Sequence, residues 1–172
     1  MENERIEALR QAAENGEAEA MYQLAMLYWY GEGVTEDSVL AAQLLEKAAE
    51  KGNVEATYRL AQCYNLGKGV DTDFKRACML YWTSAQCGCG KGMVMLARFY
   101  EKGIGVEQNY DQAIKWYLQA TETDDRDASA DAWYAMGDMC RTGRGVKKDE
   151  EEAKKYFAVA HNVRMLPRYK KG

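Results

Sequence analysis

The chain has 172 residues, of which 47% are apolar and 29% are charged, a balance that fits one globular domain or one short helical array. Its net charge of −4 argues against nucleic-acid binding as the main task. No stretch approaches the roughly 20 apolar residues that span a bilayer, and the acidic first residues lack the basic-then-apolar order of a signal peptide, so we expect a cytoplasmic protein without a membrane partner.

The first predicted element is a capping helix within residues 1–15. Leu9 and Ala12 stand 36 positions before Leu45 and Ala48, so the segment matches the second helix of a helix pair. A terminal helix of a repeat array needs a polar outer face for solubility. The charged residues expected on that face are Glu2, Arg5 and Arg10.

Four copies of a Gly-x-Gly-Val tetrapeptide follow, at spacings of 36, 36 and 40 residues. They begin at Gly31, Gly67, Gly103 and Gly143. A fixed period in this range is typical of stacked helix pairs, so we predict an all-α solenoid with about nine helices in a single domain over residues 1–172. The predicted parts after the capping helix are repeat 1 (16–51), repeat 2 (52–87), repeat 3 (88–123), repeat 4 (124–163) and a basic C-terminal tail (164–172).

Each repeat is predicted to contain two helices, as repeat 1 illustrates. Leu24 and Tyr28 lie on the apolar face of the first helix, and Gly31 ends it because glycine reaches the left-handed conformation without steric cost. Asp37 is the expected N-cap of the second helix. Where the two helices should cross most closely, the repeats carry Ala25, Ala61, Ala97 and Gly137. The four additional residues of repeat 4 fall within residues 121–127, where we expect a lengthened acidic loop.

The pattern resembles the Sel-one-like repeat family, a relative of the tetratricopeptide repeat. The family motif is Ala-x-x-x-Leu-Ala/Gly-x-x-Tyr, a Gly-x-Gly-Val turn and then Asp-x-x-x-Ala. Repeats 1 to 3 match it closely, and repeat 4 matches with Met136, Gly137 and Cys140 substituted. An ordinary tetratricopeptide array fits less well, because its units have 34 residues. The resemblance implies a right-handed superhelix whose first helices line a concave face, and an adaptor role.

The resemblance also includes a cysteine-rich branch, which has a disulfide in each repeat between cysteines eight positions apart and is linked to penicillin binding. The five cysteines of this chain depart from that spacing, and their odd number suits a reducing compartment with free thiols. Cys87 and Cys89 flank a glycine-rich turn and are either a redox-sensitive pair or idle thiols, while Cys140 is expected in the core. With His161 as the only histidine, we predict no metal site, no cofactor and no catalytic residue.

Helical phase indicates which side chains of the first helices would face a partner in a concave groove. The predicted partner-binding residues are Tyr22, Met26, Trp29, Tyr30, Tyr58, Asn65, Arg98, Tyr134 and Arg141. Tyrosine, tryptophan and arginine are frequent binding hot spots. Trp29 and Tyr30 are alternatively covered by the capping helix. The same phase exposes Glu101 and three basic residues of repeat 3, namely Lys91, Arg98 and Lys102. The basic residues either clamp an acidic peptide or a C-terminal carboxylate, or are solvated surface charges.

The sequence thus predicts a non-enzymatic protein-interaction module, an adaptor or scaffold that holds a peptide or protein partner of unknown identity. The alternative is a dedicated inhibitor such as a toxin immunity protein, because seven carboxylates and two lysines give residues 17–51 a net charge of −5, suited to covering a basic active site. A penicillin-binding hydrolase is a third and weaker alternative. The exposed aromatic residues of repeat 1 would also allow end-to-end self-association.

Overall fold

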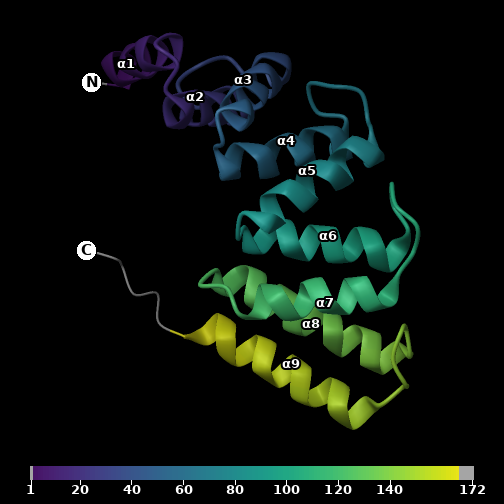
Figure 1. The fold of residues 1–172 in the computed structure, drawn as a ribbon. Helices are drawn as coiled ribbons and strands as arrows, with labels where there is room; N and C mark the ends of the chain where they lie inside the picture. The colour runs from purple at the N-terminus through teal and green to yellow at the C-terminus, as the bar shows by residue number, and fades with distance from the viewer. Residues whose placement is uncertain (1, 167–172) are drawn as a thin grey trace. The chain divides into compact units, whose positions relative to one another are not determined.

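The computed structural model describes residues 2–166 of the chain (Figure 1). Over these residues it contains nine α-helices and no strand, so the predicted all-α fold is confirmed. The helices are α1 (Glu2–Glu14), α2 (Ala18–Tyr30), α3 (Ser38–Glu50), α4 (Val54–Leu66), α5 (Phe74–Gln86), α6 (Gly90–Lys102), α7 (Tyr110–Thr121), α8 (Arg126–Thr142) and α9 (Glu150–Met165). Most of the predicted basic tail lies outside the described residues.

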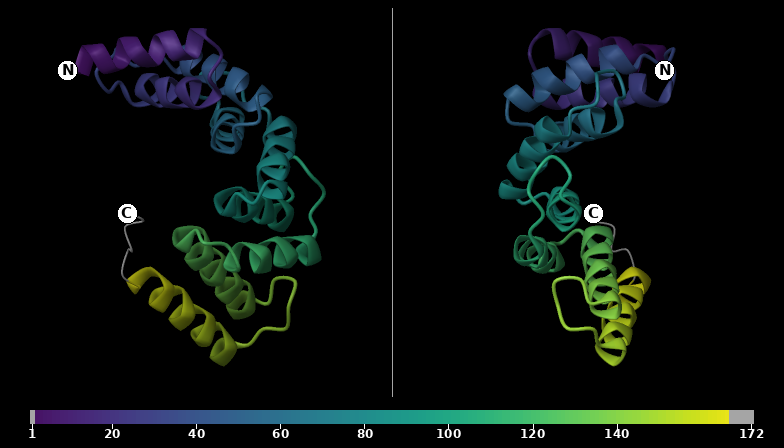
Figure 2. Two further views of the ribbon diagram at one scale, coloured as in Figure 1. Left: turned by 60° about the vertical axis from the view of Figure 1, so that its left-hand side comes forward. Right: turned by 90° about the vertical axis from the view of Figure 1, so that its right-hand side faces the viewer.

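The described helices group into two compact units. The N-terminal unit holds α1 to α5 and ends at Cys87, and the C-terminal unit holds α6 to α9 and begins at Gly88. In each unit consecutive helices pack against one another, as α2 does on α3 and α8 on α9 (Figure 2). None of the described helices is both long enough and apolar enough to cross a membrane.

The helix ends follow the predicted capping residues. Gly31 and Gly143 end α2 and α8 in the left-handed conformation, with φ of 71° and 73°. At the start of α3, the carboxylate of Asp37 accepts a hydrogen bond of 2.9 Å from the backbone N–H of Leu40. These caps use backbone groups that a helix end otherwise leaves without partners, so the local sequence itself sets where each helix stops and the next begins.

The second glycine of the turn is required by close packing. A Cβ atom on Gly69 would lie far inside van der Waals contact with the backbone of Ser38, at the start of α3. A Cβ atom on Gly145 would overlap Tyr110 in the same way at the start of α7. The turn of one repeat therefore presses against the second helix of the repeat before it, within the N-terminal unit and again within the C-terminal unit.

Small residues lie at the helix crossings as predicted. Ala25, Ala61 and Ala97 have no exposed surface. At the corresponding position in α8, a Cβ atom on Gly137 would come within 2.7 Å of the ring of Phe157 in α9. Phe157 thus occupies the space that an alanine methyl group would need, which explains the glycine in repeat 4.

The capping helix α1 packs on α2 through buried Ile6 and Ala13. Arg5 is exposed, as expected, but Arg10 is not simply on the outer face. Its guanidinium donates to the hydroxyl of Tyr28 in α2 at 3.2 Å, because α1 crosses close to that ring. The side chain of Glu2 lies outside the described part of the chain.

The prediction of a lengthened loop before repeat 4 is wrong, because the additional residues lengthen helix α8. Helix α8 has 17 residues, against 13 in α2, α4 and α6, and its N-cap Asp125 accepts from the backbone of Asp127 and Ala128 at 3.1 Å. Ala128 is buried against Gly90, whose Cβ position lies 2.9 Å from the alanine methyl group. Burial of these small residues favours an additional helical turn over a solvated loop.

Candidate partner-binding surface

Helices α2 and α4 of the N-terminal unit bring together the aromatic residues predicted for repeat 1. Spacing of four residues places Tyr22, Met26 and Tyr30 along one face of α2. Tyr22 and Met26 are half-buried, and 56% of Tyr30 is exposed. Helix α4 adds Arg59 and Gln62 beside them. We call these five residues the α2–α4 surface.

Arg59 is held in place by a short chain of hydrogen bonds. One terminal nitrogen donates to Oε1 of Gln62 at 3.1 Å, and Nε2 of Gln62 donates to the hydroxyl of Tyr58 at 3.1 Å. The guanidinium carbon lies 5.8 Å from the centre of the Tyr58 ring, within the range of a cation–π contact. Its Nε is buried and has no hydrogen-bond acceptor among the described residues.

The surroundings of Arg59 favour its cationic form. Partial burial lowers the pKa of the guanidinium, but Tyr30 nearby and a hydrogen bond to Tyr22 outweigh this, so the pKa is raised overall. Helical phase alone did not single out Arg59 as a partner contact. Its counterparts in the other repeats are the uncharged Gln23, Met95 and Ala135. A charge present at this position in only one repeat was the sequence feature that could have pointed to Arg59.

Trp29 is buried, so the prediction that it is exposed is wrong. Only 7% of the residue is exposed, because Lys68 from the turn of repeat 2 covers its ring. The Lys68 ammonium lies 4.4 Å from the ring centre, donates to the Trp29 carbonyl at 3.1 Å and pairs with Glu36 at 3.2 Å. Trp29 therefore joins repeats 1 and 2 instead of facing a partner.

Tyr58 is the second predicted contact that the structure buries. It is 7% exposed, and its ring centre lies 5.9 Å from that of Tyr81 in α5. Burial raises the pKa of Tyr81, and a hydrogen bond from half-buried Asn65 opposes that rise. Tyr58 and Asn65 thus belong to the contact between α4 and α5, where the aromatic ring of Tyr81 needs a polar partner for its hydroxyl.

In the C-terminal unit, Glu101 lies in a buried polar network, contrary to the expected exposure. It is 6% exposed and accepts from the hydroxyl of Tyr117 at 2.8 Å. Its other carboxylate oxygen lies 2.8 Å from a terminal nitrogen of Arg144, which comes from the turn of repeat 4. Burial and Glu101 raise the pKa of the Tyr117 phenol. Half-buried Arg98, which hydrogen-bonds to Tyr117, lowers that pKa and so opposes part of the rise.

The predicted contacts of repeat 4 lie on α8. Tyr134 is 57% exposed, and its ring packs 5.0 Å from that of Phe157. Arg141 is exposed and pairs with Asp138, which also pairs with Arg144. Tyr134 and Arg141 are therefore accessible on the C-terminal unit, while Tyr22, Met26 and Tyr30 gather on the N-terminal unit.

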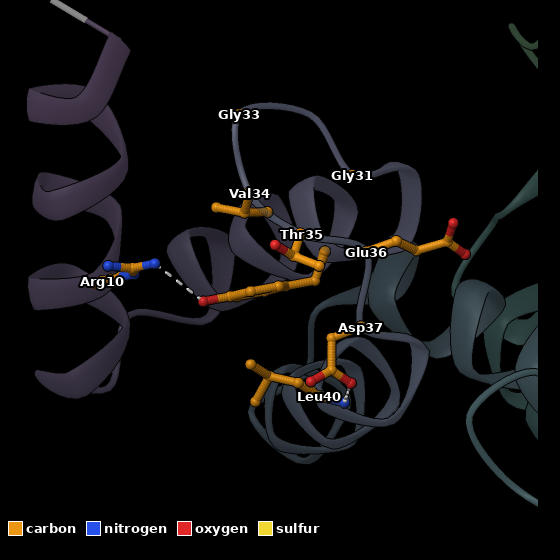
Figure 3. A pocket seen from close by; sticks show the side chains of 9 residues that line it. Arg10, Gly31, Gly33, Val34, Thr35, Glu36, Asp37 and Leu40 are labelled. Atoms are coloured by element: carbon orange, nitrogen blue, oxygen red, sulfur yellow. Dashed lines mark hydrogen bonds between the residues drawn. The ribbon is translucent and has the colours of Figure 1, made fainter.

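An open hollow of about 810 Å³ lies between α1 and the first Gly-x-Gly-Val turn (Figure 3). Arg10 reaches across it to Tyr28, and the turn from Gly31 to Asp37 forms the opposite wall. The carboxylate of Asp37 already caps α3, and Arg10 already pairs with Glu7 at 2.6 Å. The charged groups at the hollow are thus engaged in holding the fold.

Four of the five cysteine thiols are buried. All five cysteines are free, and only Cys87 is exposed. Burial raises the pKa of Cys63 to about 12, which keeps the thiol protonated and a poor nucleophile at neutral pH. Cys89 caps α6 by accepting from the N–H of Gly92 at 3.4 Å, and Cys140 is buried as predicted. The redox pairing of Cys87 and Cys89 stays a prediction.

The described residues contain no group of three or more side chains suited to a metal ion.

Successive helix pairs joined by glycine turns define a helical-repeat protein of the solenoid type. The chain belongs to the Sel1 repeat family. The Sel1 repeat model matches residues 18–53, 54–89, 90–125 and 130–160. Proteins of this family are generally protein-interaction scaffolds. No curated protein matches the chain in sequence.

Solved structures show the same fold. The chain is similar to c5321, a protective antigen of uropathogenic Escherichia coli with an SLR fold, at 32% identity and a TM-score of 0.82 over 91% of this chain and 33% of that one. It is also similar to a Sel1 repeat protein from Oxalobacter formigenes, at 29% identity and a TM-score of 0.74 over 86% and 59%. Cysteine rich protein B of Helicobacter pylori shares the fold alone, at 23% identity and a TM-score of 0.56 over 72% and 93%. The chain spans a third of the first relative and 59% of the second.

Proposed function

We propose that the chain is an adaptor whose α2–α4 surface binds a segment of a partner protein. The observation that carries this proposal is the grouping of exposed Tyr30 with half-buried Tyr22, Met26 and Arg59. Arg59 is partly desolvated and held by Gln62 and Tyr22, so it loses little conformational entropy on binding, and tyrosine and arginine are frequent binding hot spots. Because Trp29 and Tyr58 are buried, the proposed contacts are fewer than the helical phase predicts.

The C-terminal unit contributes a second set of proposed contacts. Tyr134 is its exposed aromatic residue. Arg98 and Arg141 supply positive charge, next to Tyr117 and Asp138 respectively. We assign them a supporting role, because Arg98 is committed to Tyr117 and Arg141 to Asp138. The α2–α4 surface has no comparable carboxylate among the described residues to neutralise its arginine.

Capture of partners from a native lysate tests the proposal when matched variants are compared. The immobilised chain, a Met26→Ala/Tyr30→Ala variant and a Trp82→Ala control are treated in parallel, and bound proteins are quantified by mass spectrometry. Trp82 is 49% exposed on α5 and lies outside the α2–α4 surface, so it controls for loss of any exposed aromatic ring. We expect at least one protein to fall about tenfold with the double variant and to stay with the control.

Equal recovery by all three chains would contradict the proposal. The identity of a protein that responds to the variant also separates the two forms of the function: a secreted toxin would make the chain a dedicated inhibitor, and a component of a cellular pathway would make it an adaptor. Folding of each variant is checked by its thermal unfolding midpoint.

A further inference from the structure

Arg59 has no ion-pair partner among the described residues, unlike Arg144 and Arg76. Arg144 pairs with both Glu101 and Asp138, and Arg76, which covers the ring of Tyr64, pairs with Glu46. The contacts of Arg59 within the described residues are to neutral groups, namely the Gln62 amide and the tyrosines around it. A partly desolvated cation with only neutral neighbours gains more from an added anion than an exposed one does.

The guanidinium keeps hydrogen-bonding capacity for a ligand. It carries five N–H groups, and the structure gives one bond to Gln62 and one to Tyr22. The terminal nitrogens therefore retain further N–H groups, and buried Nε has no acceptor within the described chain. A carboxylate accepts two parallel N–H groups from an arginine, which is the strongest neutralising contact available to it.

We propose that Arg59 binds the side-chain carboxylate of an aspartate or glutamate in the partner segment. The proposal rests on the α2–α4 surface being the binding surface. Gln62 and Tyr58 hold the guanidinium beforehand, and exposed Tyr30 borders it, so the acid enters a site whose donors are already oriented. Tyr30 then covers the backbone or an apolar neighbour of the acid.

The charge of the whole chain limits what kind of segment fits. The net charge is −4, and residues 17–51 alone carry −5, so a segment with many acids is repelled before it reaches Arg59. The matching segment has one acid at the position that meets Arg59 and neutral or basic residues around it. No other repeat offers this site, because the corresponding residues are Gln23, Met95 and Ala135.

Selection from a random peptide library tests this inference. Dodecapeptides displayed without a free C-terminus are selected on the full chain, on Arg59→Gln and on Arg76→Gln. Arg76→Gln is the matched control, because Arg76 already has Glu46 as its carboxylate. We expect one aligned Asp or Glu in the peptides selected by the full chain and by the control, and loss of that preference with Arg59→Gln. An Arg59→Lys variant should restore the preference for an acid only in part, since lysine lacks the planar fork.

A selected peptide then measures the pairing directly. Replacing its aligned Glu with Gln should weaken binding about tenfold for the full chain and less than about twofold for Arg59→Gln, as expected for a charge-assisted contact. Synthetic peptides with free and amidated C-termini separate the side chain from the terminal carboxylate. Dependence on the free C-terminus instead of the Glu would overturn the inference in favour of a terminal carboxylate.

The two proposals fail in different ways. If selected peptides lose affinity with Met26→Ala/Tyr30→Ala but show no acid that depends on Arg59, the α2–α4 surface stands and the carboxylate site is wrong. If no selected peptide depends on Met26, Tyr30 or Arg59, both are wrong. Thermal unfolding of each variant is compared with that of the full chain, so that loss of folding is not read as loss of binding.

Discussion

The turns of repeats 2 and 4 make the same connection with different chemistry. Lys68 and Arg144 occupy the same position of the Gly-x-Gly-Val turn. Each contacts the first helix of the repeat before its own, at the same position of that helix. In the N-terminal unit the lysine covers the ring of Trp29, whereas in the C-terminal unit the arginine pairs with buried Glu101. The variable residue of the turn thus joins consecutive repeats, and its chemistry is complementary to the residue that it contacts: a lysine on an aromatic ring, an arginine on a carboxylate.

The two connections should differ in strength. A part-exposed lysine over an aromatic ring contributes about 0.5–1 kcal/mol, whereas removing the partner of a buried carboxylate leaves an uncompensated charge and costs about 3–5 kcal/mol. Glu101 is 6% exposed, and its remaining hydrogen bond from Tyr117 cannot neutralise the carboxylate. The C-terminal unit therefore depends more on its turn than the N-terminal unit does.

The largest expected effect is that of Arg144→Ala. Loss of the ion pair with Glu101 should destabilise the C-terminal unit by about 3–5 kcal/mol, measured by urea denaturation. Adding Glu101→Gln to this variant removes the unpaired carboxylate charge and should recover part of the lost stability. A change below about 1 kcal/mol would show that Glu101 is solvated despite its burial.

Gly137→Ala tests the helix crossing of the C-terminal unit. The added methyl group would meet the Phe157 ring at 2.7 Å, so overpacking should cost about 1–3 kcal/mol. Phe157→Leu gives repeat 4 the alanine and leucine that repeat 1 has at the same two repeat positions, Ala25 and Leu45, and should relieve most of the cost. Equal stability of the single and double variants would contradict the steric explanation.

Tyr117 makes the C-terminal unit sensitive to alkaline pH. Burial and then Glu101 raise its pKa, so the folded state favours the neutral phenol. The resulting stability is complete below the unfolded pKa of about 10 and decreases as pH rises beyond it, by about 1.4 kcal/mol per pH unit for one group. Urea denaturation between pH 9 and about 11 should show a steeper decrease for the intact chain than for Tyr117→Phe. Identical slopes would mean that this phenol does not titrate on unfolding.

The smallest expected effect is that of Lys68→Ala. Loss of the contact with Trp29 should destabilise the N-terminal unit by about 0.5–1 kcal/mol. Lys68→Met keeps an aliphatic cover over the ring and loses the charge, so it separates the cation–π contribution from simple packing. A loss as large as that of Arg144→Ala would remove the difference between the two turns.

Periodicity predicted the parts of the fold that every repeat shares. The glycine and aspartate caps recur in register, so Gly31 and Asp37 were assigned correctly from local chemistry alone. The added turn of α8 was missed because acidic residues such as Asp125 suit a loop and a helix N-cap equally well. Burial of Ala128 against Gly90 decides between the two, and that contact is tertiary.

The candidate site was harder to predict, because it depends on what differs between repeats. Helical phase placed Trp29 on the surface, but phase describes one helix and not the turn of the next repeat, which supplies Lys68. It likewise gave no sign that Arg144 would reach Glu101. Arg59 departs from an otherwise uncharged repeat position, and only the packing of α2 on its side chain shows why that departure matters.

The affinity of one selected peptide for three forms of the chain tests the central claim most directly. We predict that Met26→Ala/Tyr30→Ala weakens binding by about tenfold or more, whereas Trp82→Ala leaves it unchanged, because binding energy concentrates in a few residues of an interface. Equal affinity of the intact chain and the double variant, with both folded, would contradict a binding function for the α2–α4 surface.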